Sequence, residues 1–534
     1  MTSKDSGNKE LCPKPPPVFL REATGLVRQF SWLDALMISA ANIAVGVWTI
    51  SGQIAFVTSA DPGADIVMSV HMGFLLSIPV AITYVLLGIV MPRSGSDYVW
   101  ATRLVKPVVG FMIGWGFWIA VLGVAGTLAY VWAIVVLPTF FGSFGYVSLN
   151  PGLVSLASSF SQPVPLAIAG LFFLILCTII AGIGGNVFRP AMLISFVLIL
   201  LSTVVFMGVL AVSTHSDFVN AMNGFGGSDI SYQNIMSQAQ SAGWAFAPIT
   251  WAATVLSAPF GVFLFAGQNL SAAAGGEIKT IKKSMWLSIV GSLVIAWIVA
   301  VIGIELSLNV FGYDFIQAAT FKWPLVGAPY VLFLVAPLVN GNLFLLALMQ
   351  IGFLISLPWA ISAALLVCTR YVFAFSFDRV FPSRFADISE KFHFPLKAAV
   401  LNFVGATIFF FLSAFTPYVG LLLNATAIYC IVWAIGSLCA VVLPFKKKEI
   451  ASVLPGANWP IPLISIIGLL STATMLLSFY WAVTTPAVGP STASADGVLI
   501  TILLVGLVVF YASRAVRRRE GVDLNQVYAE IPPE

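Results

Sequence analysis

The chain has 534 residues, of which 59% are hydrophobic and 9% are charged, and its mean hydropathy is +1.00. A soluble domain carries about 25% charged residues, so this composition excludes an ordinary soluble protein and indicates a protein that lies in a lipid bilayer. The formal net charge is +4, and nothing in the distribution of the charges indicates a nucleic-acid partner.

Apolar stretches long enough to span a membrane recur along the whole chain. A transmembrane helix needs about 20 predominantly apolar residues. On that measure we predict twelve helices, at residues 31–58, 66–91, 108–138, 163–185, 190–213, 245–276, 285–309, 340–374, 396–415, 418–444, 461–485 and 497–514. The apolar stretch 326–338 is too short to span, so we expect it to form a lid in an outer loop.

The segments outside these helices set the expected orientation. Residues 1–30 lack the apolar core of a cleavable signal, and we expect this segment and residues 515–534 to be cytoplasmic tails. All of the 25 lysines and arginines except Lys322 then lie on the cytoplasmic side, as the positive-inside rule requires. The sequence therefore predicts a multi-pass protein of the cell membrane with both termini inside. It leaves the oligomeric state open.

Two of the predicted helices are interrupted by glycine at corresponding places. The first is broken at residues 43–48, around Gly46, and the sixth at 263–269, around Gly267. A helix that unwinds inside a bilayer exposes backbone polar groups, which hydrocarbon tolerates only where they line a cavity or bind a ligand. A matched pair of broken helices is typical of the substrate site of a secondary transporter.

The ends of broken helices supply the groups that an amino acid zwitterion needs. One half-helix presents free N–H groups and a partial positive charge, and the other presents carbonyls. We expect the substrate carboxylate to be held by the backbone N–H groups of Val45, Gly46 and Val47. We expect the ammonium group to be held by carbonyls near Ala41 and by those of Phe263 and Ala266.

Further residues complete the predicted site at the two breaks. They are Ala44, Gly267 and Gln268, and Phe263 is placed to act as an aromatic gate. The alternative for the glycine pair is close helix packing, and Gln268 and Asn269 could equally be amides at a helix interface. Apart from helix ends, the helices expected around the site carry no Asp, Glu, Lys or Arg. Because an intramembrane charge costs at least ~2.5 kcal/mol, we predict a neutral amino acid as the substrate.

Four stretches, in order along the chain, carry a family likeness. They are Ile43-Ala44-Val45-Gly46-Val47-Trp48, Met91-Pro92-Arg93-Ser94-Gly95-Ser96-Asp97-Tyr98, Phe265-Ala266-Gly267 with Gly276-Glu277-Ile278-Lys279, and Thr369-Arg370-Tyr371 with Asp378-Arg379-Val380-Phe381-Pro382. Together they resemble motifs of the amino acid-polyamine-organocation (APC) transporters, of the amino acid permease type. The chain departs from that pattern at Ala44 and Val45, which stand where the family has glycine and serine.

The resemblance implies an all-α integral membrane protein with a LeuT-type fold. In that fold, helices 1–5 (31–213) and helices 6–10 (245–444) form 5+5 inverted repeats, and two additional C-terminal helices occupy residues 461–514. It also implies alternating access to a site midway across the membrane. An enzyme is not expected, because the three histidines fall on different helices or sides of the membrane and no hydrolytic constellation assembles.

Other polar residues give the predicted gate and ion site. Glu277 ends the sixth helix near the inner side, with Arg93 or Arg370 as its expected partner in an inner gate, and a solvated surface pair as the alternative. Ser356 and Ser362 are candidate oxygen ligands for sodium, and ordinary packing serines are the alternative. No other metal site and no cofactor are expected. The coupling ion, a proton or sodium, is left open.

These observations predict a secondary transporter that moves a neutral amino acid by alternating access. Two alternatives of the same fold remain open. One carries cationic amino acids or polyamines, since a cation–π contact with Phe263 would favour a cation by about 0.5–2 kcal/mol. The other is an inorganic-ion cotransporter.

Overall fold

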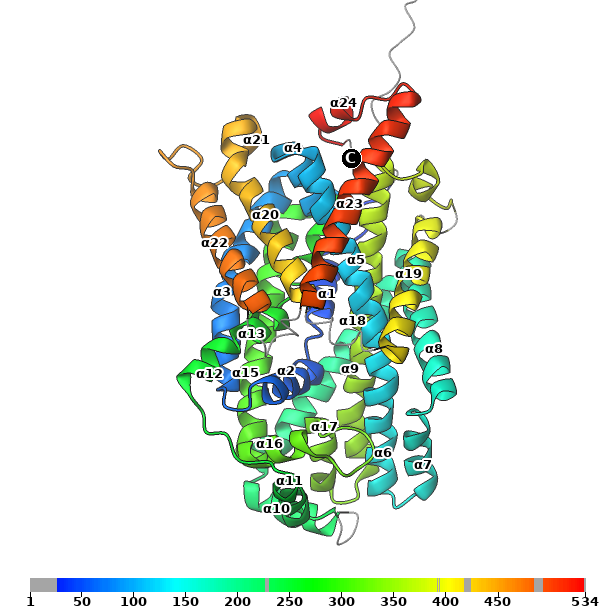
Figure 1. Cartoon of the computed structure of the whole chain (residues 1–534), viewed down its shortest axis with the longest axis vertical. Coiled ribbons are helices and arrows are strands. Elements are labelled where there is room, and N and C mark those ends of the chain that lie inside the picture. The colour runs from blue at the N-terminus through cyan, green and yellow to red at the C-terminus, as the bar shows by residue number, and fades with distance from the viewer. Residues whose placement is uncertain are drawn as a thin grey trace, which may run out of the picture.

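The computed structural model describes residues 26–225, 230–390, 392, 394–416, 424–484 and 493–532. This part of the chain is helical (Figure 1), and its β-type pairing consists of two isolated bridges, Phe30 with Ile278 and Ser94 with Ala274. Within it, eleven helical stretches are long and apolar enough to cross a membrane. The expected all-α membrane fold is therefore confirmed.

The long helices follow the predicted spans closely. Eight of them are α3 (Ile66–Val90), α8 (Pro163–Gly182), α9 (Gly185–Val212), α18 (Leu343–Phe377), α19 (Leu396–Phe415), α20 (Asn424–Lys446), α22 (Leu463–Thr484) and α23 (Ala493–Arg519). Two more contain a π-helical turn, namely α5 (Pro107–Val131) with η1 (Trp132–Val136) and α6 (Leu137–Val147), and α14 (Ile281–Met285) with η5 (Trp286–Val290) and α15 (Gly291–Phe311). The start of the predicted tenth helix, 418–423, lies outside the described residues.

The first predicted span consists of two helices, α1 (Trp32–Asn42) and α2 (Val47–Ala60). Ser31 begins α1 through a capping box, which satisfies N–H groups that the first turn leaves unpaired. Gly46 has φ of +141°, a conformation that glycine adopts without steric cost. A Cβ atom at Gly46 would lie 2.5 Å from Cγ2 of Ile199 in α9. The break therefore requires glycine for its backbone conformation and for the approach of α9.

The sixth predicted span is interrupted more extensively. It contains α12 (Trp251–Leu256) and α13 (Ala258–Leu264), then a turn at 265–269 and the 3₁₀ turns η3 (Leu270–Ala273) and η4 (Gly275–Glu277). Gly267 has φ of +98°, and a Cβ atom there would lie 2.7 Å from Cβ of Asn42, the last residue of α1. Both predicted breaks are confirmed, and they contact each other.

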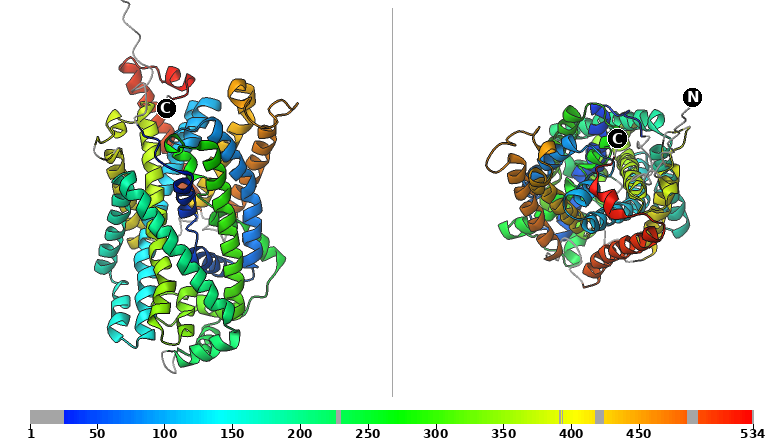
Figure 2. Two further views of the ribbon diagram at one scale, coloured as in Figure 1. Left: turned by 180° about the vertical axis from the view of Figure 1, so that it is seen from behind. Right: turned by 90° about the horizontal axis from the view of Figure 1, so that it is seen from above.

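The two ends of the helix bundle differ in charge. At one end lie α4 (Ser96–Leu104), α21 (Lys448–Ala451) and α24 (Leu524–Ala529), and at the other lie α7 (Pro151–Ser159), α10 (His215–Gly224) and α11 (Tyr232–Ser241), as Figure 1 and Figure 2 show. The first end carries the basic residues of α4, of the connection after α20 and of the last turn of α23. We call it the basic end, and we call the other the opposite end.

The stretch predicted to form a lid lies toward the opposite end (Figure 1). It contains α17 (Val331–Leu334) and the 3₁₀ turn η6 (Ala336–Val339), and the side chains of residues 331–336 are buried. The ring of Tyr330 stacks on Trp48 of α2, with centroids 6.0 Å apart. The stretch therefore packs on the helix that follows the first break. A change of its exposure with substrate stays a prediction.

The long helix α18 forms the wall that both breaks share. Every residue from Ser356 to Phe377 is buried, and the helix contacts α1, α5, α8 and α9. Over this length α18 is enclosed on all sides. One of its faces contacts the two breaks, and its other faces contact the surrounding helices.

Candidate functional site

A cavity of about 110 Å³ lies between the two helix breaks, α5 and α18. One water molecule needs roughly 10–15 Å³, so the cavity has room for a small solute. Its lining is mostly apolar, and its polar side chains, all uncharged, are those of Asn42, Thr49, Gln53 and Tyr429. The hydroxyl of Tyr429 has no hydrogen-bond partner within the described part of the chain.

The structure brings four of the predicted site residues to this cavity. Ala44, Phe263, Ala266 and Gly267 line it directly. Five others are buried behind the lining and do not face the cavity, namely Ala41, Val45, Gly46, Val47 and Gln268.

The helices α2 and α5 contribute nine lining residues that were not among the predictions. Along α2 they are Trp48, Thr49, Gly52, Gln53 and Phe56, and along α5 they are Phe117, Val121, Val124 and Leu128. Both sets have the spacing of three and four residues that marks one face of a helix. In α2 this face starts directly after the break, so the position of the break together with helical spacing identifies it.

At the first break, the backbone donors differ in availability. The N–H of Val45 donates to the carbonyl of Ala40 at 3.1 Å. For the N–H groups of Gly46 and Val47, the described residues supply no acceptor. Since α2 begins at Val47, these two groups lie at the positive end of its helix dipole. The first break therefore offers donors suited to an anionic group.

At the break in the sixth span, the carbonyls differ in whether they already accept a hydrogen bond. The carbonyl of Phe263 accepts the N–H of Ala266 at 2.9 Å, whereas the carbonyl of Ala266 receives no backbone donor from the described residues. The carbonyl of Ala41, in the first span, accepts the N–H of Ala44 at 2.8 Å. The ring of Phe263 lies edge-on to that of Phe56, with centroids 6.3 Å apart, so two aromatic rings form part of the cavity wall.

The amide side chains of Gln268 and Asn269, within the break in the sixth span, do not line the cavity. Nε2 of Gln268 donates to the carbonyl of Ser77 in α3 at 3.3 Å. Oε1 of Gln268 and Oδ1 of Asn269 are buried and have no partner among the described residues. Leaving a buried acceptor unpaired costs about 1–3 kcal/mol, so this break, like the one in the first span, keeps buried polar groups without a partner among the described residues.

Arg370 and Glu277 form a buried ion pair on the basic side of the cavity. Nε and Nη2 of Arg370 lie 2.5 and 2.8 Å from the two oxygens of Glu277, and the side chains are 1% and 0% exposed. Arg370 is six residues beyond Ala364, the last lining residue of α18, so it lies about 9 Å further along the helix axis. The pair therefore stands between the cavity and the basic end, and it is not the solvated surface pair considered as the alternative.

The segment before α1 is hydrogen-bonded to the backbone at Glu277 and Lys279. The N–H groups of Gln29 and Phe30 both donate to the carbonyl of Glu277 at 2.9 Å, and the N–H of Lys279 donates to the carbonyl of Phe30 at 3.0 Å. Arg93, the other predicted partner of Glu277, instead donates from Nε to the carbonyl of Pro532 at 2.7 Å.

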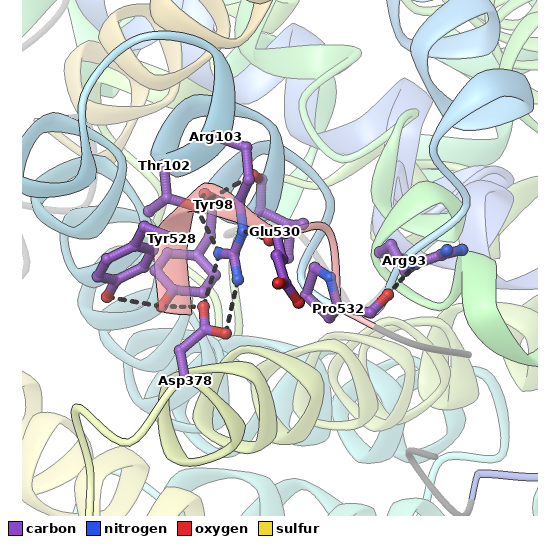
Figure 3. A network of polar contacts seen from close by, with 9 residues as sticks. Arg93, Tyr98, Thr102, Arg103, Asp378, Tyr528, Glu530 and Pro532 are labelled. Atoms are coloured by element: carbon purple, nitrogen blue, oxygen red, sulfur yellow. Dashed lines mark hydrogen bonds and ion pairs between the residues drawn. The ribbon is translucent and has the colours of Figure 1, made fainter. Parts of the chain in front are cut away.

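A second polar network joins α4, α18 and the C-terminal segment (Figure 3). Arg103 forms a two-point ion pair with Asp378, with both distances 2.7 Å, and the hydroxyl of Tyr98 donates to the same carboxylate at 2.7 Å. Tyr528 of α24 lies against them, with its hydroxyl 3.3 Å from that of Tyr98 and its ring centroid 5.0 Å from the guanidinium of Arg103. Nε of Arg103 also donates to the carbonyl of Glu530. Residues of both terminal segments thus pack against the basic end.

The two serines considered for sodium are bonded to their own helix. The hydroxyl of Ser356 donates to the carbonyl of Phe353 at 2.9 Å, and that of Ser362 donates to the carbonyl of Pro358 at 2.7 Å. Neither lines the cavity. Within the described ranges, no group of three or more His, Cys, Asp or Glu side chains could hold a metal ion. A sodium site at these serines stays a prediction.

Comparison with known proteins gives a consistent result. A sequence profile described as amino acid permease matches residues 30–510. The chain is 23% identical over 479 residues to the methylthioribose transporter of Bacillus subtilis (strain 168), a match that covers 86% of this chain and 89% of that protein. Its fold is similar to the crystal structure of MhsT in complex with L-phenylalanine, with a TM-score of 0.53 and 16% identity, over 84% of this chain and 98% of the other. MhsT has the LeuT fold, so the expected fold is confirmed.

Proposed function

Because the chain belongs to the amino acid permease family of the APC superfamily, we propose that its substrate is a neutral amino acid. The protein is a multi-span membrane transporter of a small molecule. The observation that carries the proposal is the chemistry of the cavity between the two helix breaks. Its lining, within the described residues, contains no Asp, Glu, Lys, Arg or His.

The uncharged lining favours a substrate without a charged side chain. A cationic or acidic side chain would have to leave water with no opposite charge beside it, and an intramembrane charge costs at least ~2.5 kcal/mol. An apolar side chain would instead contact the rings of Phe263 and Phe117 and the aliphatic wall of Val121 and Ile361. This argument weighs against the alternatives of cationic amino acids, polyamines and inorganic ions.

The backbone charges of the amino acid are proposed to lie at the helix ends. The free N–H groups of Gly46 and Val47 suit the carboxylate, and the carbonyl of Ala266 suits the ammonium group. The N–H groups lie one layer behind the lining, so binding would require a small local adjustment there. The hydroxyl of Thr49, which donates to the carbonyl of Ala44 at 2.7 Å, holds the first break in position.

Transport is proposed to occur by alternating access between the inverted repeats, residues 31–213 and 245–444. In this proposal the buried ion pair of Arg370 with Glu277 closes the basic end, and substrate would come from the opposite end. We propose that the basic end faces the cytoplasm of the cell membrane, because basic residues collect on the cytoplasmic side.

A neutral thio-sugar is the second candidate substrate. The relative named a methylthioribose transporter covers most of the chain, and the cavity carries neutral amide and hydroxyl groups on Asn42, Thr49 and Gln53. Such groups hydrogen-bond a sugar hydroxyl without requiring a charge on the ligand.

Uptake into proteoliposomes tests the proposal. Purified protein is reconstituted, and uptake of labelled L-leucine, L-phenylalanine and L-alanine is compared with that of L-arginine, putrescine, methylthioribose, rubidium and chloride. We expect the neutral amino acids to be taken up and to compete with one another. Preferred uptake of arginine or putrescine, of methylthioribose, or of the inorganic ions would replace the proposal by the corresponding alternative.

A cavity-filling variant links uptake to the site. Ala364→Phe places a ring in the cavity and is expected to reduce uptake at least tenfold at unchanged protein yield. Val204→Trp in α9, at a position 67% exposed on the outer face of the bundle, is the matched control and should transport normally. Equal uptake by Ala364→Phe and wild type would mean that substrate binds elsewhere.

A further inference from the structure

Within the described residues, four buried carboxylates lie at the basic end, and three of them have an arginine partner. Glu277 pairs with Arg370, Asp34 pairs with Arg189, and Asp378 pairs with Arg103, the last of which Figure 3 shows. The fourth, Asp97 in α4, is 1% exposed. No lysine, arginine or histidine of the described chain contacts it. A buried carboxylate without a positive partner is unusual, since burial strongly disfavours an uncompensated charge.

Asp97 is held instead by hydroxyl groups from two spanning helices. The hydroxyl of Tyr371 in α18 donates to Oδ1 at 2.5 Å, and that of Tyr84 in α3 donates to Oδ2 at 3.1 Å. The backbone N–H of Tyr98 also donates to Oδ1, at 2.8 Å. From α20, the titratable group that faces Asp97 is the thiol of Cys439. The carboxylate therefore joins one helix of each proposed repeat, α3 and α18.

Tyr371 also connects Asp97 to the cavity. Its ring centroid lies 5.1 Å from that of Phe117, and Phe117 lies 5.4 Å from Tyr429. Both Phe117 and Tyr429 line the cavity. Two aromatic side chains thus separate the bound substrate from Asp97, and a shift of either helix at the cavity would change the Asp97 contacts.

The surroundings of Asp97 set the direction of its response to pH. Burial raises the pKa of Asp97 from its ordinary value of 3.8 to about 6, and the hydrogen bonds from Tyr371 and Tyr84 oppose that rise. Once the basic end opens and water reaches the carboxylate, its pKa falls back toward the ordinary value. The closed arrangement therefore binds the proton more tightly. By linkage, a bound proton stabilises closure, and the loss of the proton favours opening.

We propose that Asp97 is the protonation site that couples substrate transport to a proton, which it holds while the basic end is closed and releases there on opening. The step breaks the O–H bond of the Asp97 carboxylic acid and transfers its proton to water at the basic end, and no other covalent bond changes. This inference rests on the proposed transport function. It adds the coupling ion and the residue that binds it.

The distance across the basic end gives a test that needs no substrate. Spin labels are attached to Lys282→Cys and Ser383→Cys, two exposed positions at that end, in the full chain with Cys12→Ser. The cysteines at 177, 368, 430 and 439 are buried and are not expected to react. The population of the longer distance is then measured in samples frozen at different pH values. In the wild type we expect the ratio of the open to the closed population to rise by up to about 100-fold between pH 4 and 6, which is up to tenfold per pH unit.

Substitutions at Asp97 and its partners separate coupling from a structural role. Asp97→Asn mimics the protonated form and should keep the closed distance at every pH. Tyr371→Phe removes a donor to the charged carboxylate, so the pH range of opening should move upward, and Tyr84→Phe should move it less because its hydrogen bond is longer. Asp217→Asn and Tyr313→Phe, which act at the opposite end, should leave the range unchanged.

Transport in proteoliposomes completes the test. A pH gradient should accelerate leucine or phenylalanine uptake by the wild type. Asp97→Asn should lose that acceleration and should exchange substrate more slowly than the wild type, because its basic end stays mostly closed. If the wild type transports no amino acid, the proposed function fails, while the spin-label distances still decide the role of Asp97. The inference is overturned if the wild-type distance ignores pH, if Asp97→Asn keeps the wild-type pH dependence, or if Tyr371→Phe moves the range downward or not at all.

Discussion

The break in the first span is shorter and more regular than the break in the sixth. After the first, an α-helix of 14 residues resumes at Val47, and the Val45 N–H and the Thr49 hydroxyl bond neighbouring carbonyls. After the sixth, the chain continues only as 3₁₀ turns to Glu277, and Gln268 keeps a buried unpaired oxygen. The first break is thus a fixed helix start that presents N–H groups, whereas the sixth is an irregular segment that presents carbonyls.

This difference indicates which charged group of an amino acid each break is suited to bind. A helix start has a fixed direction and a positive partial charge, so it suits a carboxylate that must be held in one orientation. An irregular segment has carbonyls in several directions, which suits an ammonium group with three donors. The following substitutions test that assignment, from the largest expected effect to the smallest.

The largest effect is expected from Gly46→Val. The Cβ atom of the new side chain would lie 2.5 Å from Cγ2 of Ile199, in a backbone conformation that disfavours branched residues. We expect uptake to fall more than 100-fold while the protein still inserts. Gly208→Val in α9, where a Cβ atom meets nothing within 4 Å, is the control. If both variants were lost from the membrane fraction, the low uptake would reflect failed folding or insertion and not a defect of the substrate site.

The next effect is expected from the ion pair that ends the sixth break. Arg370→Ala leaves the fully buried Glu277 without a partner, which costs about 3–5 kcal/mol, so the melting temperature should fall clearly. Arg189→Ala breaks the pair with Asp34 at the start of the first span, but Arg189 is 45% exposed and such pairs contribute about 0–1 kcal/mol. Similar melting temperatures for the two variants would contradict the expectation that the buried ion pair stabilises the protein more than the exposed one.

A smaller effect is expected at the contact between the two breaks. Gly267→Ala adds about 1–3 kcal/mol of backbone strain at positive φ and a Cβ atom 2.7 Å from that of Asn42. Gly243→Ala has nearly the same φ, +97°, with nothing within 4 Å. Both should lose stability, and Gly267→Ala alone should lose about tenfold in uptake. Equal uptake by the two would mean that the breaks need not touch.

The smallest effects separate the side chains of the two breaks. Thr49→Val removes the 2.7 Å hydrogen bond to Ala44, which is worth about 0.5–1.5 kcal/mol, and should weaken substrate binding up to about tenfold. Gln268→Leu removes one long hydrogen bond and one unpaired oxygen, so we expect less than a threefold change. Substrate affinity measured by competition uptake checks both. A larger loss in Gln268→Leu would give that side chain a direct role in binding.

The sequence by itself determined the spans, the two breaks and the side on which the charges collect. Each depends on the local chain: a span needs an apolar run of fixed length, and a break appears as glycine inside such a run. Gly46 and Gly267 could therefore be identified from the local sequence, without knowledge of the residues that contact them in the folded protein. The expected family fold followed from short motifs that lie at the ends of these helices.

The tertiary structure alone decided which groups meet. Arg93 and Arg370 were equal candidates for Glu277, and packing places Arg370 beside it while Arg93 contacts Pro532. Asp97 belonged to a family motif, but its lack of an arginine partner became visible only when α3, α4 and α18 were assembled. Such pairings depend on the rotation of each helix about its axis, and a uniformly apolar helix carries no sequence period that fixes this rotation. Contacts between side chains far apart in the chain fix it instead.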